Sequence, residues 1–429
     1  MDTTVVVVGA GLSGLVAARA LHRRGVEVVV LEAAGRIGGR VLSETTVLGS
    51  RLDLGGQWIG ADHHRVTALA TEFGATKFPM RAGMFPGLIE AGKRVPPWSL
   101  ALLPAGLALA VAGVLARTGT PKRWNRTTLG SVLRAVPGRR ARGLLEALVA
   151  VSWTVDPERF SVEAMARMIR VQGGLRTMLS AGGGAQEALL AEGMGALVDG
   201  LAAELGPRVR TRAAVTSIVR DDDGVTVRTG VDRLRAAKVV IAVPPPVAAR
   251  IAHEPPLPRQ RLDLEKNTSM GTVHKAIAVY ERPFWRERAD GEFLSLDGLG
   301  QTVFDTTSPG GPGHLCVLVG GPRARWLDGL DAAARRDALL RPLVPHLGSA
   351  VLEPAGWHEK AWHLDEHVGG GYTALPEPGA TDGFPPLSSA PSGHVHWAGS
   401  ETAREHPGYL DGAIEAGERA AVEVAEALG

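Results

Sequence analysis

The first forty residues constrain the fold of this chain more than any other stretch. Residues 5–8 are consecutive valines, a β-branched run that is typical of a buried strand. A turn rich in glycine follows directly, residues 15–24 have the composition of a helix, and Gly25 ends that helix. Residues 26–31 are again mostly apolar and lead to Glu32. This order of strand, glycine turn, helix and strand predicts an α/β unit with parallel strands.

The turn at residues 9–14, Gly-Ala-Gly-Leu-Ser-Gly, has the spacing that a dinucleotide pyrophosphate requires. Gly9 permits the tight turn, Gly11 lets a phosphate approach the backbone, and Gly14 lets helix and strand pack closely. The free N–H groups at the helix start face the phosphates, where the helix dipole favours negative charge. Glu32 is placed to accept hydrogen bonds from an adenosine ribose. The predicted dinucleotide contacts are Gly9, Gly11, Leu12, Ser13, Gly14 and Glu32.

Two further glycine pairs follow, at residues 36–40 (Arg-Ile-Gly-Gly-Arg) and 53–58 (Asp-Leu-Gly-Gly-Gln-Trp). The first can bring backbone donors and guanidinium charge onto a diphosphate. With these segments the chain resembles the flavin-dependent amine oxidases of the monoamine oxidase family, in which they wrap FAD. Residues 55–59 are most similar to the bacterial putrescine oxidase branch. The FAD contacts that the resemblance implies here are Arg36, Gly39, Arg40, Gly55, Gly56, Gln57 and Trp58.

The length of the chain predicts more than one domain, because 429 residues exceed one ordinary core. After residue 190 the pattern of strands and helices typical of the N-terminal part returns. This pattern, with the resemblance to the amine oxidase family, predicts a mixed α/β and α+β fold. A Rossmann-type FAD-binding domain would comprise residues 1–76, 190–255 and 367–429. A substrate-binding domain of sheet plus helices would comprise residues 77–189 and 256–366. The chain would thus pass between the two domains repeatedly.

The amino-acid composition indicates which binding partners and which cellular compartment to expect. A net charge of +2, with no basic run interleaved with aromatic residues, argues against nucleic acid. The single cysteine, Cys316, excludes an intramolecular disulfide and favours a reducing compartment. The sequence starts directly on a strand, without the pattern of a secretion signal. We therefore expect a cytoplasmic protein; its oligomeric state is left open, with a homodimer as one alternative.

Residues 98–116 carry no charge, and they are long enough to span a bilayer. Pro104 and two glycines interrupt the segment, and its bulky side chains recur at helical spacing. Small residues on the other face suit close packing inside a protein. We therefore favour a buried helix of the substrate domain. A helix that contacts a membrane surface, and a true membrane span, are the alternatives; in either, basic residues would flank the apolar segment.

Lys275 stands within an otherwise apolar strand, residues 274–280, where a lysine needs a buried partner or a function. The residues that follow, Glu-Arg-Pro-Phe-Trp at 281–285, are similar to the segment after the family's active-site lysine. The resemblance implies that Lys275 acts beside flavin N5 through a water molecule. A cation there would stabilise negative charge on dioxygen as it takes up electrons. The alternative is an edge-strand lysine that reaches solvent.

Two of the three tyrosines fall in segments that close the flavin site in the family. Tyr372 lies in Gly-Gly-Gly-Tyr-Thr at 369–373, and Tyr409 lies in His-Pro-Gly-Tyr-Leu at 406–410. The resemblance implies that both rings flank the amine in an apolar slot, which favours the uncharged amine. Trp362 is predicted to form a wall of the same cavity. The family also places a glutamine beside the substrate, here Gln186, and Trp58 is a further predicted pocket residue.

The C-terminal part completes the expected cofactor site. Residues 395–402 are expected to form a strand and a tight turn, and residues 411–421 a helix whose N–H groups face the flavin. The resemblance implies that Val215 holds the adenine through its backbone. It also indicates non-covalent FAD, because Gly371 stands where the mammalian enzymes carry a flavin-linked cysteine. The implied contacts here are Val215, Gly399, Ser400, Glu401, Gly412, Ala413 and Ile414.

The resulting prediction is an FAD-dependent amine oxidase. Its partners would be a small-molecule amine and dioxygen, and its products an imine, then an aldehyde and ammonia, and hydrogen peroxide. No metal site is expected, because His394 and His396 lack acidic or cysteine partners at ligand spacing. One alternative is a desaturase or protoporphyrinogen-oxidase-like enzyme, which needs neither Lys275 nor the tyrosine pair. Another is a flavin-holding module without turnover.

Overall fold

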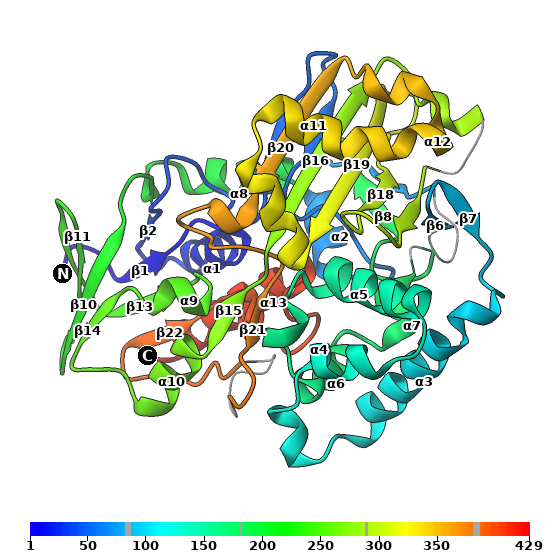
Figure 1. Ribbon diagram of the computed structural model, residues 1–429. Helices are drawn as coiled ribbons and strands as arrows, with labels where there is room; N and C mark the ends of the chain where they lie inside the picture. The colour runs from blue at the N-terminus through cyan, green and yellow to red at the C-terminus, as the bar shows by residue number, and fades with distance from the viewer. Residues whose placement is uncertain (82–86, 181, 288–290, 381–386) are drawn as a thin grey trace.

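The computed structural model describes residues 1–81, 87–180, 182–287, 291–380 and 387–429. Figure 1 shows a five-stranded sheet on the left, a seven-stranded sheet at the upper right and a layer of helices below the second sheet. The predicted fold class, a Rossmann-type α/β unit combined with a sheet and helices, is confirmed. The sheets are built from segments that are distant in the sequence, so the chain passes between them several times.

The five-stranded sheet contains β1 (Val5–Val8), β2 (Val28–Leu31), β9 (Val209–Arg210), β13 (Lys238–Ile241) and β22 (Val395–Trp397). Its order is β22-β13-β1-β2-β9, and every neighbouring pair is parallel. Side chains alternate between its faces. Val5 and Val7 pack in a core with α1 (Leu12–His22), α8 (Gly195–Leu205) and α13 (Leu410–Glu426), whereas Val6 and Val8 face a second, four-stranded sheet.

The four-stranded sheet consists of β10 (Val215–Asp221), β11 (Gly224–Thr229), β12 (Arg233–Ala236) and β14 (Ala252–Glu254). Within the described residues, three further sheets have two strands each: β3 (Ser43–Thr45) with β4 (Arg51–Asp53), β5 (Lys77–Pro79) with β8 (Ala188–Leu190), and β15 (Thr268–Met270) with β21 (Ala374–Pro376). The helices of this half also include α2 (His64–Glu72), α9 (Pro245–Ala248) and α10 (Arg259–Lys266).

The seven-stranded sheet contains β6 (Gly87–Glu90), β7 (Lys93–Val95), β16 (Val273–Tyr280), β17 (Phe293–Ser295), β18 (Thr302–Asp305), β19 (Gly313–Gly320) and β20 (Gly356–Ala361). Its order is β20-β16-β19-β18-β17-β6-β7. One face packs against α11 (Ala332–Leu340) and α12 (Val344–Leu347), which Figure 1 shows above the sheet. The opposite face carries Lys275, Phe304 and Leu318 toward a cavity.

The helical layer contains α3 (Leu103–Thr118), α4 (Leu129–Ala135), α5 (Arg139–Trp153), α6 (Val162–Val171) and α7 (Leu175–Leu179). A short 3-10 helix, η1 (Leu100–Leu102), leads into α3. Apolar side chains of these helices share a core with Val95, Leu294 and Leu375 of the neighbouring strands, and Phe160 and Met168 in this core are fully buried. The helical layer therefore packs directly against strands of the neighbouring sheets.

The structure differs from the sequence-based expectation at two elements. Helix α1 begins at Leu12 and not at residue 15, so the glycine turn is shorter than expected and its last residues form the first helical turn. The segment 98–116 was expected to be a buried helix, and this is wrong. By length and composition the helix from Leu100 to Thr118 could cross a membrane, but only 22% of its most apolar stretch is buried in the protein. The spacing of the apolar residues correctly predicts a helix. It does not predict that most of this helix is exposed.

Candidate active site

A cavity of about 790 Å³ lies where the two large sheets and the helical layer meet. Its walls run from the glycine turn after β1, past the loops at residues 36–40 and 55–58, to the inner face of the seven-stranded sheet. Tyr409 and Ala413, at the start of α13, close it from the C-terminal side. Segments from both ends of the sequence thus contribute to one cavity.

The glycine turn forms one end of the cavity. Gly9, with φ of +100°, makes the tight turn, and Gly11, Leu12 and Ser13 line the wall. A Cβ on Gly14 would lie 2.0 Å from the Gly9 carbonyl oxygen, so this glycine serves packing between helix and turn and does not line the cavity. The first residues of α1 line the cavity, so the free N–H groups at the start of this helix can bind a phosphate there.

Glu32 lies at the same end and is buried. Its carboxylate accepts hydrogen bonds from the backbone N–H groups of Ala10 and Ala34, both at 2.8 Å. These two bonds fix the orientation of the carboxylate at the end of β2, and a carboxylate retains lone pairs for further donors. Val215, the predicted adenine contact, lines the wall nearby. The geometry fits the ribose and adenine side of a dinucleotide.

Arg40 links the first cavity loop to the C-terminal part of the chain. Its guanidinium donates to the Glu401 carboxylate at 2.7 Å, to Ser400 Oγ at 3.0 Å and to the Tyr372 carbonyl at 2.9 Å. Burial alone would raise the pKa of the Glu401 carboxyl. The charge and hydrogen bonds of Arg40, with the Ala374 N–H, outweigh burial and hold this pKa below its usual value. Arg40 and Glu401 therefore fix the segment that carries Tyr372.

Lys275 extends from β16 into the cavity and is 3% exposed. Its Nζ donates hydrogen bonds to the Gly55 carbonyl at 2.9 Å and to Gln57 Oε1 at 2.6 Å. Nζ also lies 5.4 Å from the centre of the Trp58 ring. Burial lowers the pKa of Lys275, while the nearby Cys316 and Asp53 act in the opposite direction. The alternative of an edge-strand lysine that reaches solvent is wrong.

Tyr372 and Tyr409 both line the cavity, and they come from segments that are close in space. Burial raises the pKa of both phenols above the usual range, so both remain protonated at neutral and moderately alkaline pH. Tyr409 caps the start of α13, and the ring of His63 packs edge-on behind it at 5.2 Å. The two tyrosines therefore offer uncharged aromatic surface to whatever the cavity holds.

The predicted pocket residues Trp58, Trp362 and Gln186 also line the cavity. Trp362 Nε1 donates to the Leu54 carbonyl at 2.8 Å, and Trp58 stacks edge-on against Phe304 at 5.1 Å. Within the described residues, the buried Trp58 Nε1 has no hydrogen-bond acceptor. A donor left in this way inside a cavity is suited to an acceptor atom on a bound molecule.

Most of the predicted cofactor contacts line the cavity, but five do not: Gly14, Gly399, Glu401, Gly412 and Ile414. Ile414 belongs to the core beneath the five-stranded sheet. A Cβ on Gly412 would lie 2.1 Å from the His406 carbonyl oxygen, so this glycine permits close packing at the start of α13. Glu401 lies behind Arg40, as described above. These residues therefore support the site from outside its wall.

The cavity face of the seven-stranded sheet is not evident from the sequence alone. The register aligns Leu294 with Thr302, Thr302 with Leu318, and Phe304 with Cys316. Because side chains alternate along a strand, Leu294, Thr302, Phe304 and Leu318 all face the cavity with Lys275. Glu292, two residues before Leu294, lines the same wall. The alternation of side chains along each strand can be read from the sequence. The pairing of the strands, which decides which face lines the cavity, cannot.

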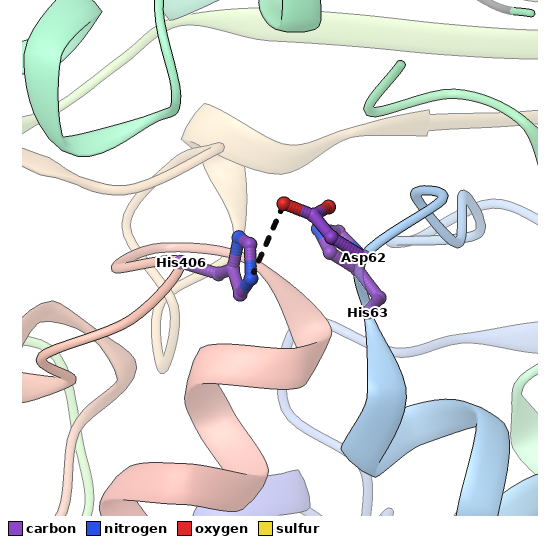
Figure 2. A group of neighbouring side chains, drawn as sticks. All are labelled: Asp62, His63 and His406. Carbon is purple, nitrogen blue, oxygen red and sulfur yellow. Dashed lines mark ion pairs between the residues drawn. The ribbon is translucent and has the colours of Figure 1, made fainter. Parts of the chain in front are cut away.

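A second cluster that the sequence alone does not reveal consists of Asp62, His63 and His406, which lie together (Figure 2). The rings of His63 and His406 lie 5.2 and 6.4 Å from the Tyr409 ring. The ligand atoms of the three residues lie within 4.8 Å of one another, a spacing that a metal ion could use. However, His63 Nδ1 accepts a hydrogen bond from the Gly60 N–H at 2.9 Å. Burial, with His406, lowers the pKa of His63 to about 4, so the ring is neutral with its proton on Nε2. That nitrogen then lacks the lone pair of a metal ligand, and the cluster is better explained as support for Tyr409.

Comparison with known proteins gives consistent results. A family model described as flavin containing amine oxidoreductase matches residues 12–425. The flavin-containing monoamine oxidase AofH of Mycobacterium tuberculosis, as that protein is described, is 35% identical over 99% of this chain and 97% of its own length. A putrescine oxidase of Kocuria rosea is 33% identical over 99% of this chain and 95% of its own. The solved structure of cyclohexylamine oxidase from Brevibacterium oxydans is similar over 100% of both chains, with a TM-score of 0.93 and 30% identity.

Proposed function

The chain belongs to the flavin-containing amine oxidoreductase family, and on this premise we propose that it oxidises an amine held uncharged between Tyr372 and Tyr409. As an amine oxidase it converts a Cα–N bond to an imine, which water hydrolyses, and dioxygen is reduced to hydrogen peroxide. The cavity supports this site, because Lys275 and both tyrosines line it together. The relatives named above are amine oxidases, which favours this function over a desaturase or a binding module without turnover.

FAD supplies the electron acceptor for this chemistry. The cavity fits it: the glycine turn offers open backbone to a diphosphate, Glu32 is held in place at the nucleotide end, and Trp58 Nε1 is left without an acceptor among the described residues. The chain residues proposed to hold FAD are Gly9, Gly11, Leu12, Ser13, Glu32, Arg36, Gly39, Arg40, Gly55, Gly56, Gln57, Trp58, Val215, Ser400 and Ala413.

We expect FAD to be held without a covalent bond. Gly371 lines the cavity next to Tyr372 and offers no side chain for a thioether. A Cβ at this position would lie 3.2 Å from Val273 Cγ1, which leaves little room for one. The thiol of Cys316 is buried in β19, and burial raises its pKa, so it is a weak nucleophile. Precipitation in trichloroacetic acid should therefore release all of the flavin into the supernatant, and flavin absorbance in the washed pellet would contradict the proposal.

The tyrosine slot predicts a characteristic pH dependence. An ammonium would lose its hydration in the cavity without gaining an anionic partner from either neutral phenol, so the uncharged amine is the form that binds. We expect kcat/KM to rise about tenfold per pH unit and to level off near the pKa of the substrate amine, ~10 for an alkylamine by analogy with lysine.

Two substrates of different basicity make this test specific. The break in the profile should move with the amine pKa, because it belongs to the substrate and not to the protein. Tyr409→Phe, which keeps the ring, should preserve the profile, whereas Tyr409→Ala should raise KM. A profile that is flat from neutral to alkaline pH, or a break that stays fixed when the amine is changed, would refute binding of the uncharged form.

The division of the chain into two domains is part of the proposal. The FAD-binding part would comprise residues 1–76, 190–255 and 367–429, and it contains all strands of the five-stranded sheet. The substrate-binding part would comprise residues 77–189 and 256–366, with the seven-stranded sheet and the helical layer. We also propose a cytoplasmic location, for which the support is the buried, reduced Cys316.

A further inference from the structure

An apolar surface on η1 and α3 is exposed over most of its length. Trp98 is 81% exposed, Leu100 79% and Leu107 68%. Beyond η1 the exposed side chains recur every three or four residues, so they form one stripe along the helix. We call this stripe the α3 apolar face, and it consists of Trp98, Leu100, Leu103, Leu107, Val111 and Val114. A contiguous surface of this kind marks an interaction site on a protein that otherwise buries such side chains.

The opposite side of α3 is attached to the protein. Ala105, Ala112 and Ala116 are buried in the core of the helical layer, where α3 packs on α5 and α6. Arg170 of α6 donates a hydrogen bond to the Ala116 carbonyl. Lipid could not surround a helix held in this way. α3 is therefore suited to lie along a surface, as interfacial amphipathic helices do, and not to span a bilayer. Figure 1 shows it at the outer edge of the molecule.

Charge indicates what the surface contacts. Residues 91–145 contain no aspartate or glutamate and ten lysines and arginines, so this segment carries +10 in a chain whose net charge is +2. The remaining residues together carry −8. Six of the basic residues are exposed and flank the apolar face: Lys93, Arg94, Arg117, Lys122, Arg123 and Arg126. A second copy docking through the same face would bring like charges together, whereas an anionic lipid surface is complementary.

We propose that the α3 apolar face and its basic flanks dock the protein on the surface of an anionic lipid bilayer. Trp98 and the leucines would enter the boundary between headgroups and acyl chains, and the lysines and arginines would pair with lipid phosphates. The same segment lines one end of the cavity through Pro97, Leu102, Gly106 and Leu109, of which Pro97 and Gly106 are exposed. Docking therefore brings the apolar end of the cavity next to the lipid, where an apolar amine would concentrate.

Vesicle co-sedimentation tests the proposal on the full-length flavoprotein. The probes are vesicles of phosphatidylcholine alone, and of phosphatidylcholine with 30% phosphatidylglycerol, an anionic fraction of about a third chosen to give a strong surface field. We expect sedimentation with the anionic vesicles, and release when salt rises from about 0.1 M to 1 M, because the Debye length falls from ~10 to ~3 Å. Binding is read without turnover, so its result is independent of whether the proposed amine chemistry is correct.

Matched variants distinguish the two components. Leu107→Asp should weaken binding about tenfold by removing apolar burial. The double change Lys122→Ala and Arg123→Ala should weaken it roughly 30-fold and reduce its dependence on salt. Val231→Asp and Arg233→Ala, at exposed positions in the β11–β12 hairpin, serve as controls and should bind like the parent protein.

Three outcomes would overturn the proposal. The first is that the protein stays in the supernatant with anionic vesicles at low salt. The second is that Leu107→Asp and Val231→Asp bind equally well. The third is that the protein forms a dimer which Leu107→Asp dissociates, without any vesicle binding, since the face would then be an interface between two copies.

Discussion

Lys275→Met is expected to slow the reaction of the amine-reduced enzyme with dioxygen by roughly 10²–10³-fold. Lys275 is buried on the inner face of the seven-stranded sheet, where its Nζ donates to the Gly55 carbonyl and to Gln57, and we propose that it is a cation when dioxygen reacts. Dioxygen gains negative charge when it accepts electrons, and a cation fixed in an apolar cavity stabilises that charge more than water does. Methionine has a similar length without the charge. Rapid mixing of the amine-reduced enzyme with oxygenated buffer measures the effect.

Anaerobic reduction by the amine should change only a few-fold in the same variant, because we propose that the tyrosines, and not Lys275, hold the amine. This contrast separates a role toward dioxygen from general damage to the site. Lys77→Met, on the exposed edge strand β5, is the matched control and should react with dioxygen at the parent rate. A parent-like oxygen reaction in Lys275→Met would show that the proposed role is wrong.

Glu401→Ala is expected to lower the free energy of unfolding by about 3 kcal/mol, a cost typical of breaking a buried ion pair. Glu401 is 1% exposed and accepts hydrogen bonds from Arg40, from the Ala374 N–H and from Thr373 Oγ1. Its loss would leave Arg40 without its carboxylate and would loosen the segment that carries Tyr372. Urea titration of flavin-saturated protein measures the change.

The effect should depend on pH in a defined direction. The pKa of Glu401 is lowered in the folded protein, so its contribution to stability is fully present above the pKa of an unfolded glutamate, ~4.3. It is lost as pH falls through the folded value. The stability difference between the parent and Glu401→Ala should therefore shrink below about pH 4. Asp337→Ala removes an exposed pair with Arg341 and should leave stability nearly unchanged at any pH. An equal loss in both variants would contradict the role of Glu401.

The parts of the site that follow from local sequence were predictable. The turn at Gly9–Gly14 has its own spacing signature, and Lys275 could be singled out because a lysine in an apolar strand needs a partner. Tyr372 and Tyr409 were identified by short segments around them. Each of these features can be recognised from a segment of about ten consecutive residues.

What could not be predicted depends on contacts between distant segments. Glu401 was assigned to the cofactor, but its partner Arg40 lies 361 residues away, and only the fold shows that the pair supports Tyr372 from behind. His63 was overlooked for the same reason, since its neighbour His406 comes from the other end of the chain. The exposure of α3 could not be predicted, because the spacing of apolar residues shows which side of a helix is apolar. It does not show whether another part of the protein covers that side.

The packing of α1 against α13 has a consequence for synthesis of the protein. A Cβ on Gly417 would lie 2.4 Å from the Ser13 carbonyl oxygen, so the two helices meet backbone to backbone. Because α1 is synthesised well before α13, it completes its packing only after α13 has been made, and the part of the cavity wall that α13 contributes does not exist until then. At ~5–20 residues per second, roughly 20–80 s separate the two events. We therefore expect flavin to bind only after α13 has been synthesised, so the cofactor cannot stabilise the earlier parts of the chain before that point.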